Sequence, residues 1–520
     1  MTNVLTAFSC QRTFVIFYLL NSDITGGVVH NYAFSCIHRH IGCRQRKCAW
    51  NLDGAHAVVV NAEPLLPYTV DLFCITNMER RTFLKLAAVL PSLALAGCGG
   101  SKTLLSAKDP TMLSIWHVYG EQADSPMNRL LTEFNDTVGK EKGILLNVTN
   151  MTNSAAIGGQ LQDAKAGKPG ALDLPDLFSA HPSDASALGI ETLVDWNDWF
   201  TAEDMAAYVP GFVQDGIIEG RQVVFPVSKS TQLIFLNGSQ YARFAADTGA
   251  QLSTLATWDG FFEMAGAYRQ WSQGKPFCAL DYPLRLVELN ALEQGSGELY
   301  KGSWYDLTNK AFRASWMEFA KALVQGDILV SDLYSNTQVM TGETLAGLGS
   351  SAAILYYNDF VTYPDNTTEP TDLLLAPLPH AAGTTTPLMP QAGVGLCAFK
   401  TTDQKAEAAA VFLRWFTEQQ RNLEFAADTG YMPVSSAAFD AIADYPFEQQ
   451  SYQRLYDVYN EMRLQNTPLS EPGIVGYHAK AKALYDSLRQ RQKDYPQRLA
   501  NGETLEALTE ETWQLLCDNA

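Results

Sequence analysis

Gln222-Val-Val-Phe-Pro-Val-Ser-Lys-Ser-Thr-Gln-Leu-Ile-Phe-Leu-Asn237 is the stretch that decides how this chain is organised. Apolar and β-branched residues on both sides of Pro226 predict extended, strand-like structure. The stretch is much longer than a typical strand of about 5–6 residues. We therefore predict a ribbon that leaves one lobe of the protein and enters another.

The residues before this ribbon alternate between strand and helix patterns. Strands are predicted at 112–117, 143–149 and 174–179. One helix begins at Ser125-Pro126, an N-cap followed by proline at the first helical position, and a second covers about 155–166. This order predicts an α/β lobe with a parallel sheet, whose ligands bind beyond the carboxyl ends of the strands.

The residues after the ribbon repeat this mixture and then become helical. Further helices are predicted at about 283–293 and 309–325, and strands at 372–379 and 391–399. The predicted tail helices are 404–428, 436–443, 447–463, 476–490 and 503–517. The predicted fold is α/β with two lobes, each a mixed or parallel sheet flanked by helices, a hinge between them and a helical C-terminus.

Arg80-Arg-Thr-Phe-Leu-Lys-Leu-Ala-Ala-Val-Leu-Pro-Ser-Leu-Ala-Leu-Ala-Gly-Cys98 has a basic start, a short apolar run and small residues before a cysteine. This pattern is typical of an export signal and is too short to span a bilayer. Leu-Ala-Gly-Cys resembles the lipobox of bacterial lipoproteins, which implies a signal peptide at 78–97 and lipidation of Cys98. Residues 1–77 are then an over-extended start without structure, and 98–109 a linker. Both the Sec and the twin-arginine export routes stay open.

The net charge limits the kinds of partner that this protein can bind, and the cysteine spacing bears on disulfide formation. The chain has a formal net charge of −19, and residues 98–520 carry 29 Lys/Arg against 51 Asp/Glu. Such an acidic protein repels phosphate backbones and anionic head groups, so we expect no nucleic-acid partner and a membrane contact only through lipid. Cys98, Cys278, Cys397 and Cys517 are widely spaced, which indicates no disulfide framework. Upstream, Cys36, His38, His40, Cys43 and Cys48 are zinc-ligand residue types, but their spacing fits no standard structural site.

Several short pieces, in order, carry a family pattern. They are Pro175-Asp-Leu-Phe178, Gly220-Arg-Gln-Val-Val-Phe-Pro226, Thr257-Trp-Asp259, Ala376-Pro-Leu-Pro379, Ala408-Ala-Ala-Val-Phe-Leu-Arg-Trp415 and Thr429-Gly-Tyr-Met-Pro-Val434. With them, the chain resembles the extracellular solute-binding proteins of bacterial ABC importers, in particular the carbohydrate-binding group that includes maltose-binding protein.

The resemblance implies two lobes that close over a solute. The first lobe would comprise 110–228 and 378–433, and the second 229–377 and 434–520, with hinge strands near 227–233 and 375–379. Closure would let ABC permease subunits distinguish the loaded protein from the empty one. The resemblance further implies a monomer, anchored by lipid on the extracytoplasmic face of the cell membrane, without cofactor, metal or catalytic residues.

The resemblance also places the binding site, by position in the family pattern. Sugars need aromatic plates and a rim of hydrogen-bonding groups. The implied ligand-binding residues are Tyr119, Glu121, His181, Asp184, Lys229, Ser230, Thr231, Tyr282, Tyr356, Tyr357, Asn358 and Gln391. Lys229 could instead pair with a carboxylate.

Other functions stay open on the sequence alone. Nucleophile-elbow, phosphate-loop and zinc-protease motifs are missing from the sequence, but a glycan-acting enzyme needs only two carboxylates and no motif. A polyol phosphate or a polyamine is the alternative solute to a sugar or oligosaccharide. The sequence identifies neither the solute nor its chain length.

Overall fold

The computed structural model describes residues 103–119, 125–151, 154–331 and 334–520, together with four short strands near the start of the chain. The chain divides into two units, Met1–Lys102 and Thr103–Ala520. The early strands are β1 (Val4–Cys10), β2 (Thr13–Leu19), β3 (Ala33–Cys36) and β4 (Lys47–Ala49), which form an antiparallel sheet.

The predictions for the start of the chain are only partly addressed by these strands. We predicted residues 1–77 to be without structure, and the four strands differ from that expectation. The predicted signal peptide at 78–97 and the predicted lipidation site Cys98 lie outside the described residues. That residues 1–97 are no part of the working protein therefore stays a prediction.

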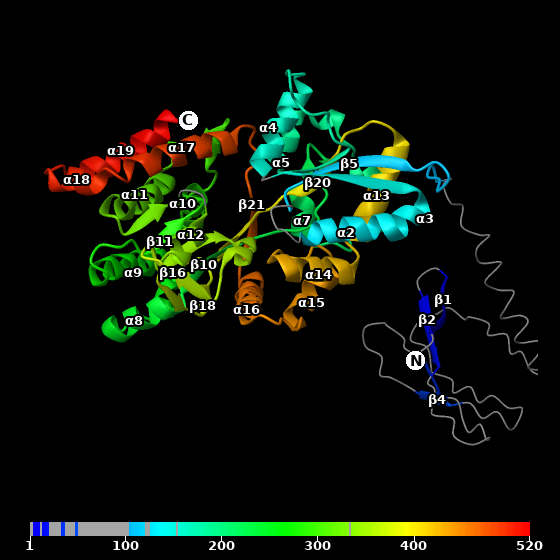
Figure 1. Ribbon diagram of the computed structural model, residues 1–520, viewed down its shortest axis with the longest axis horizontal. Coiled ribbons are helices and arrows are strands. Elements are labelled where there is room, and N and C mark those ends of the chain that lie inside the picture. Colours follow the sequence, from blue (N-terminus) through cyan, green and yellow to red (C-terminus); the bar gives the residue numbers. More distant parts are fainter. Residues whose placement is uncertain are drawn as a thin grey trace, which may run out of the picture. The chain divides into compact units, whose positions relative to one another are not determined.

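The first sheet of the larger unit has the strand order β20-β7-β5-β6. Its strands are β5 (Thr111–His117), β6 (Ile144–Asn150), β7 (Leu177–Ala180) and β20 (Gly395–Ala398). β5 lies parallel to β6 and β7, as the strand–helix alternation predicted, while β20 joins antiparallel from far along the chain. The helices around this sheet are α2 (Pro126–Phe134), α4 (Ser154–Lys165), α5 (Pro182–Leu188) and α13 (Asp403–Phe416) (Figure 1).

The second sheet has the order β14-β11-β15-β10-β18. Its strands are β10 (Gln232–Asn237), β11 (Cys278–Leu280), β14 (Ile328–Val330), β15 (Ala346–Ser350) and β18 (Leu373–Ala376). The first three in the order are parallel, and β10 is antiparallel to both of its neighbours. Its helices are α8 (Gly238–Thr248), α9 (Trp258–Trp271), α10 (Pro283–Glu293), α11 (Lys310–Gln325) and α12 (Ser335–Met340).

Each sheet has a core around it, and the first core also takes in Leu233 and Phe235 of β10 and Leu373 and Leu375 of β18. Leu113, Phe134, Leu396 and Phe412 belong to the core around the first sheet. Phe261, Leu280, Trp316 and Leu348 belong to the core around the second. A smaller cluster with Trp116 and Phe178 covers the other face of the first sheet. The fold is therefore two-lobed and mixed α/β, as predicted.

The helical tail is divided between the two cores. α14 (Gln419–Thr429), α15 (Ser436–Ala441) and α16 (Gln450–Gln465) contribute to the first core. α17 (Tyr477–Arg491), α18 (Tyr495–Ala500) and α19 (Leu505–Asp518) contribute to the second, beside α11 in Figure 1. The predicted helix 404–428 is two helices, because the chain turns at Thr417 and Glu418 between α13 and α14.

The segment from Gln222 to Asn237 is not the continuous strand-like ribbon that we predicted. Only its ends are in strands, in β9 (Arg221–Gln222) and β10. Between them Phe225, Lys229 and Ser230 make isolated bridges to Leu396, Met432 and Ala392. Because two separate segments, 392–396 and the one around Met432, supply these partners, the crossing chain follows no single neighbour.

A further connection runs beside this crossing. β19 (Leu388–Gln391) pairs in parallel with β21 (Thr467–Ser470), the strand that leads from α16 to the helices of the second core. Three stretches of chain thus pass between the two cores. The lobe and hinge boundaries predicted from the sequence stay predictions.

The remaining elements are short. They are the π-helix Asn135–Gly139, α3 (Lys140–Lys142), α6 (Ala202–Met205), α7 (Pro210–Asp215), the hairpins β8 (Ile217–Ile218)–β9, β12 (Tyr300–Lys301)–β13 (Trp304–Tyr305) and β16 (Phe360–Thr362)–β17 (Thr368–Pro370), and several 3-10 turns. Among the described residues, no helix combines the length and the apolar character that crossing a bilayer requires.

Candidate functional site

Three tyrosines follow the carboxyl ends of the parallel strands in the second sheet. Tyr282 lies two residues after β11, Tyr334 follows β14, and Tyr356 follows β15. Their exposed fractions are 40%, 43% and 42%, which is high for large aromatic side chains. They lie at the edge of the sheet where α/β proteins bind their ligands.

Two further tyrosines come from the first lobe. Tyr119 follows β5, and its ring packs edge-on against that of Tyr431, with 5.6 Å between the centroids. The Tyr119 hydroxyl lies 3.0 Å from Ser228 Oγ, and burial raises its pKa to about 12. Tyr119 is thus mostly covered, whereas Tyr431 is partly exposed.

The tyrosines of the two lobes lie close enough to act on one another electrostatically. Burial raises the pKa of Tyr431, and the hydroxyls of Tyr119, Tyr356, Tyr282 and Tyr334 raise it further. Desolvation also raises the pKa of Tyr282 although its ring is exposed, which is expected of a ring in a concave surface. We call these five residues the tyrosine cluster.

Tyr357 and Asn358 do not belong to this cluster. The ring of Tyr357 stacks on Phe235 of β10, with 4.6 Å between the centroids and 16° between the planes. Its hydroxyl lies beside Ser335 and Asp281, within the second lobe. Asn358 is exposed, and its backbone N–H donates to Met340 Sδ. Of the neighbouring tyrosines, Tyr356 is the one near the tyrosine cluster.

The predicted residues of the crossing segment are buried and serve the connection between the lobes. Lys229 forms an ion pair with Asp215, in which both side chains are almost fully buried, so it has the carboxylate partner that the sequence allowed. Ser230 and Thr231 are also buried. Thr231 Oγ1 has no hydrogen-bond partner among the described residues.

Gln391 connects two of the crossing strands. Its Nε2 donates to Gly211 O at 3.1 Å and to Ser470 Oγ at 3.3 Å. The side chain is buried, and its Oε1 has no hydrogen-bond partner in the described part of the chain. An unsatisfied buried amide oxygen can accept a hydrogen bond from a polar ligand or a water.

His181 is part of a cluster that the sequence did not predict. Its Nδ1 lies 3.0 Å from Glu471 Oε2, and its ring lies 4.9 Å from that of His478. Burial lowers the pKa of His181, but Glu471 and Asp184 outweigh it, so the net pKa is raised. Burial raises the pKa of Glu471, but the two histidines and Arg285 hold it at about 2. Glu121 lies outside the described residues.

The sequence missed Tyr334, Tyr431, Glu471 and His478. Tyr334 could have been found if Ile328–Val330 had been predicted as a strand, because it then follows a carboxyl end. Glu471 and His478 belong to a tail that reads as helical, and nothing local shows that it returns to the crossing segments. Tyr431 was quoted only as part of a family motif.

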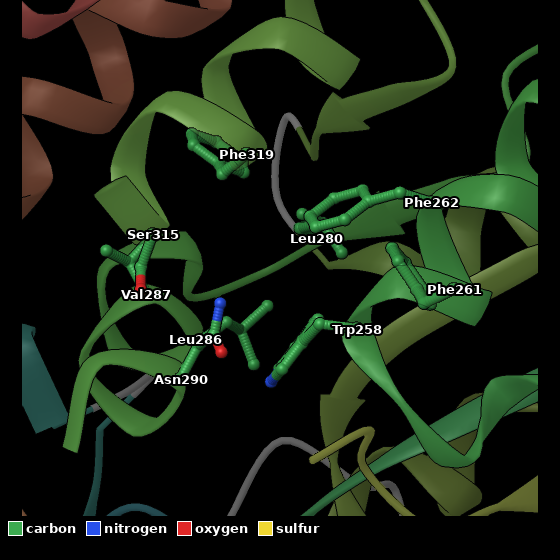
Figure 2. A pocket seen from close by; sticks show the side chains of 9 residues that line it. All are labelled: Trp258, Phe261, Phe262, Leu280, Leu286, Val287, Asn290, Ser315 and Phe319. Atoms are coloured by element: carbon green, nitrogen blue, oxygen red, sulfur yellow. The ribbon is translucent and has the colours of Figure 1, made fainter. Parts of the chain in front are cut away.

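The second lobe also contains an internal pocket, which is not an alternative to the tyrosine cluster as a solute site. Figure 2 shows its lining of mostly apolar side chains from α9, α10, α11 and β11, with Trp258, Phe262 and Phe319 around it. Its free space is about that of one water molecule. It is too small for a sugar.

The structure has two lobes, several chain crossings between them, and a tyrosine cluster to which both lobes contribute. These features define the class of two-lobed binding proteins. The chain belongs to the family of bacterial extracellular solute-binding proteins, whose model matches residues 130–447. It is thus an extracellular solute-binding protein. Comparison with curated proteins gave no match.

The match to several solved structures of similar fold covers nearly the whole length of those chains. The cyclic alpha-maltosyl-1,6-maltose binding protein from Arthrobacter globiformis is 18% identical, with a TM-score of 0.56 over 79% of this chain and 99% of that one. The ABC substrate-binding protein from Listeria monocytogenes in complex with cycloalternan is 12% identical, with a TM-score of 0.59 over the same shares. UgpB from Mycobacterium tuberculosis, in complex with glycerophosphocholine, is 16% identical, with a TM-score of 0.57 over 77% and 99%.

Proposed function

We propose that this protein captures a sugar or oligosaccharide by closing its lobes over it, and delivers it to the permease of an ABC importer without chemical change. The observation that carries the proposal is the tyrosine cluster, in which both lobes supply rings. Tyr282, Tyr334 and Tyr356 are exposed, and an apolar sugar face stacks on such rings while its hydroxyls bond at their rim.

Membrane attachment is the second part of the proposal. Cys98 at the end of the apolar run would carry the lipid and hold the protein at the extracytoplasmic face. Cys98→Ala is expected to move the protein from the membrane fraction to the soluble fraction while its solute affinity stays the same. Retention of the variant in membranes would refute the anchor.

The solute class can be tested by thermal shift. The purified chain would be heated with mono- and oligosaccharides, polyol phosphates, polyamines and amino acids, because a ligand that binds only the native state raises the melting temperature. We expect a saturable rise with one family of sugars and no turnover of that sugar. Turnover would point to an enzyme instead.

The tyrosine cluster can be tested by substitution. Tyr282→Ala and Tyr356→Ala should each weaken sugar binding by about 1–3 kcal/mol in calorimetry, since each removes a stacking ring. Tyr282→Phe keeps the ring and should bind almost normally. Tyr357→Phe is the matched control, because its hydroxyl lies within the second lobe. Equal affinities for all four variants would contradict the aromatic site.

A cationic solute, such as a polyamine, is the second candidate. Glu471 lies close enough to Tyr282 to raise its pKa, and a carboxylate beside aromatic rings suits an organic cation. A thermal shift with polyamines alone, lost in Glu471→Gln, would favour this candidate over the sugar.

A further inference from the structure

We propose that His181, Glu471 and His478 form a binding site for a divalent transition-metal ion such as Zn²⁺, at the place where the two lobes and a crossing segment meet. One ligand atom from each residue can be chosen so that all three lie within 4.8 Å of one another. His181 Nδ1 lies 3.0 Å and His478 Nε2 lies 4.0 Å from the same oxygen, Glu471 Oε2.

These separations are close to those that zinc requires. Tetrahedral zinc with bonds of about 2.0–2.1 Å places its ligand atoms about 3.3 Å apart. The present ligand atoms lie within 4.8 Å of one another, so side-chain rotation has to shorten the longest separation by at most about 1.5 Å. His478 Nε2 is buried and makes no hydrogen bond within the described residues, so no existing bond of that atom is lost when it turns to a metal.

The donor set selects the kind of ion. Two imidazoles and one carboxylate suit zinc, copper or nickel, whereas magnesium and calcium prefer sites made of oxygen atoms. A set of three protein ligands also leaves a position for water or for a fourth side chain. Asp184 is near enough to act electrostatically on both His181 and His478, but it is not among the three residues whose ligand atoms lie within 4.8 Å of one another.

The backbone holds each ligand in place. His181 is the N-cap residue of α5, directly after β7, and His478 lies in the first turn of α17. Glu471 follows β21, whose carbonyls at Leu469 and Ser470 accept hydrogen bonds from Arg285. Binding therefore needs side-chain adjustment and release of the proton between His181 Nδ1 and Glu471 Oε2, within elements that packing already fixes.

The local charge favours a cation. Arg285 and Lys229 also act on the cluster, but each cation has an acidic partner of its own, Glu288 and Asp215, so each pair is neutral as a whole. With neutral imidazoles, Glu471 and Asp184 leave an excess of two negative charges beside the two histidines. A divalent ion compensates that excess in a partly buried place where charge is costly.

The three proposed metal ligands come from different parts of the molecule, so a bound ion would act on the contact between the lobes. His181 comes from the first lobe, Glu471 from the crossing segment and His478 from a helix in the second core. An ion bound to all three joins the lobes directly. We therefore expect metal to favour the contact between them, independently of any sugar.

The test is calorimetric titration of the metal-free full chain with zinc chloride and with magnesium chloride. The wild type is compared with Glu471→Gln and His478→Gln. Because Cys36, His38, His40, Cys43 and Cys48 can also take zinc, the result is the binding event that differs between wild type and variant. We expect that event to weaken at least about tenfold in both variants, and magnesium to give no such event.

His380→Gln is the matched control. His380 also contacts a carboxylate, Glu293, at 2.8 Å, but it is not one of the three ligands. This variant should keep the zinc event. A second measurement is the melting temperature, which zinc should raise in the wild type and not in His478→Gln. If both cluster variants melt like the wild type without metal and bind zinc as it does, the proposed site is wrong.

Discussion

His117 is a histidine held in its neutral form at the end of β5. Burial lowers its pKa to about 4, against a smaller opposite effect of Asn128. Its Nδ1 accepts a hydrogen bond from the Tyr119 backbone N–H at 3.2 Å, so Nε2 carries the proton and donates to Asn128 Oδ1 at 3.1 Å. Protonation of Nδ1 removes the bond that holds Tyr119.

This histidine predicts a loss of stability in acid. Its pKa is about 4 in the folded protein and 6.5 in the unfolded chain, so the unfolded chain binds more protons between these pH values. The free energy of unfolding should therefore fall by up to about 3 kcal/mol as the pH drops from 6.5 to 4. Urea unfolding at several pH values measures it, and His117→Gln should reduce the slope. An equal slope in that variant would assign the loss to other groups.

The buried ion pair of Lys229 and Asp215 predicts a large cost when it is broken. Asp215→Ala leaves a buried ammonium without a partner, which should destabilise the protein by about 3–5 kcal/mol in urea unfolding. The double variant Lys229→Met, Asp215→Leu should recover most of that loss. Glu510→Ala is the control, since it breaks the exposed pair with Arg313 and should cost less than about 1 kcal/mol. Equal costs for the two single variants would contradict the buried pair.

The C-cap of α14 connects backbone conformation to the tyrosine cluster. Gly430 has φ +70°, and a Cβ there would lie 2.8 Å from Ser351 O and 2.4 Å from Ile354 Cγ2. The next residue is Tyr431. The backbone therefore has to pass this point closely, and only glycine allows it.

Gly430→Ala should both destabilise the protein, by about 2 kcal/mol, and weaken solute binding through displacement of Tyr431. Gly249→Ala is the matched control, because Gly249 is also a helix C-cap with φ +76°, but a Cβ added there would have nothing within 4 Å. It should cost about 1 kcal/mol and leave affinity unchanged. The two effects are read by urea unfolding and calorimetry, and identical behaviour of both variants would refute the close approach.

Elements with local sequence signals could be predicted, whereas elements whose partners lie far along the chain could not. α10 begins and ends where the pattern placed it, because Pro283 at the first position and a run of apolar residues are local signals. The segment after Gln222 has a strand-like composition, yet its partners lie at Met432, Ala392 and Leu396, which no local pattern can reveal. Its apolar residues are needed for burial at the crossing and not for a ladder.

The residues of the candidate site that follow strand ends could be predicted from the sequence. Those that come from the later segment around β21 could not, because that segment returns to the first lobe from far along the chain. Tyr282 and Tyr356 follow β11 and β15, so their neighbourhood could be inferred. Tyr357 is also a tyrosine and is the next residue in the sequence, but its ring stacks on Phe235. Glu471 reaches His181 only because β21 pairs with β19.

Closure of the two lobes on a solute is a prediction about the whole molecule. Small-angle scattering of the chain with and without its sugar should show a smaller radius of gyration when sugar is bound, because hinge closure brings two compact bodies together. The comparison uses Tyr282→Ala at the same sugar concentration, which should stay near the empty value. A bound sugar without any change in the wild type would contradict hinge closure.

The strand β20 has a consequence for how this protein is made. Gly395 pairs with Ala180, 215 residues earlier, and the whole second sheet lies between them in the chain. During synthesis the outer edge of β7 therefore stays uncovered until most of the polypeptide has emerged. Pairings of such long range form slowly, and an open strand edge invites aggregation. A nascent chain that cannot complete its first lobe early stays unfolded for longer. This suits translocation across a membrane in the unfolded state. A chaperone that binds the unfolded chain would be useful until translocation.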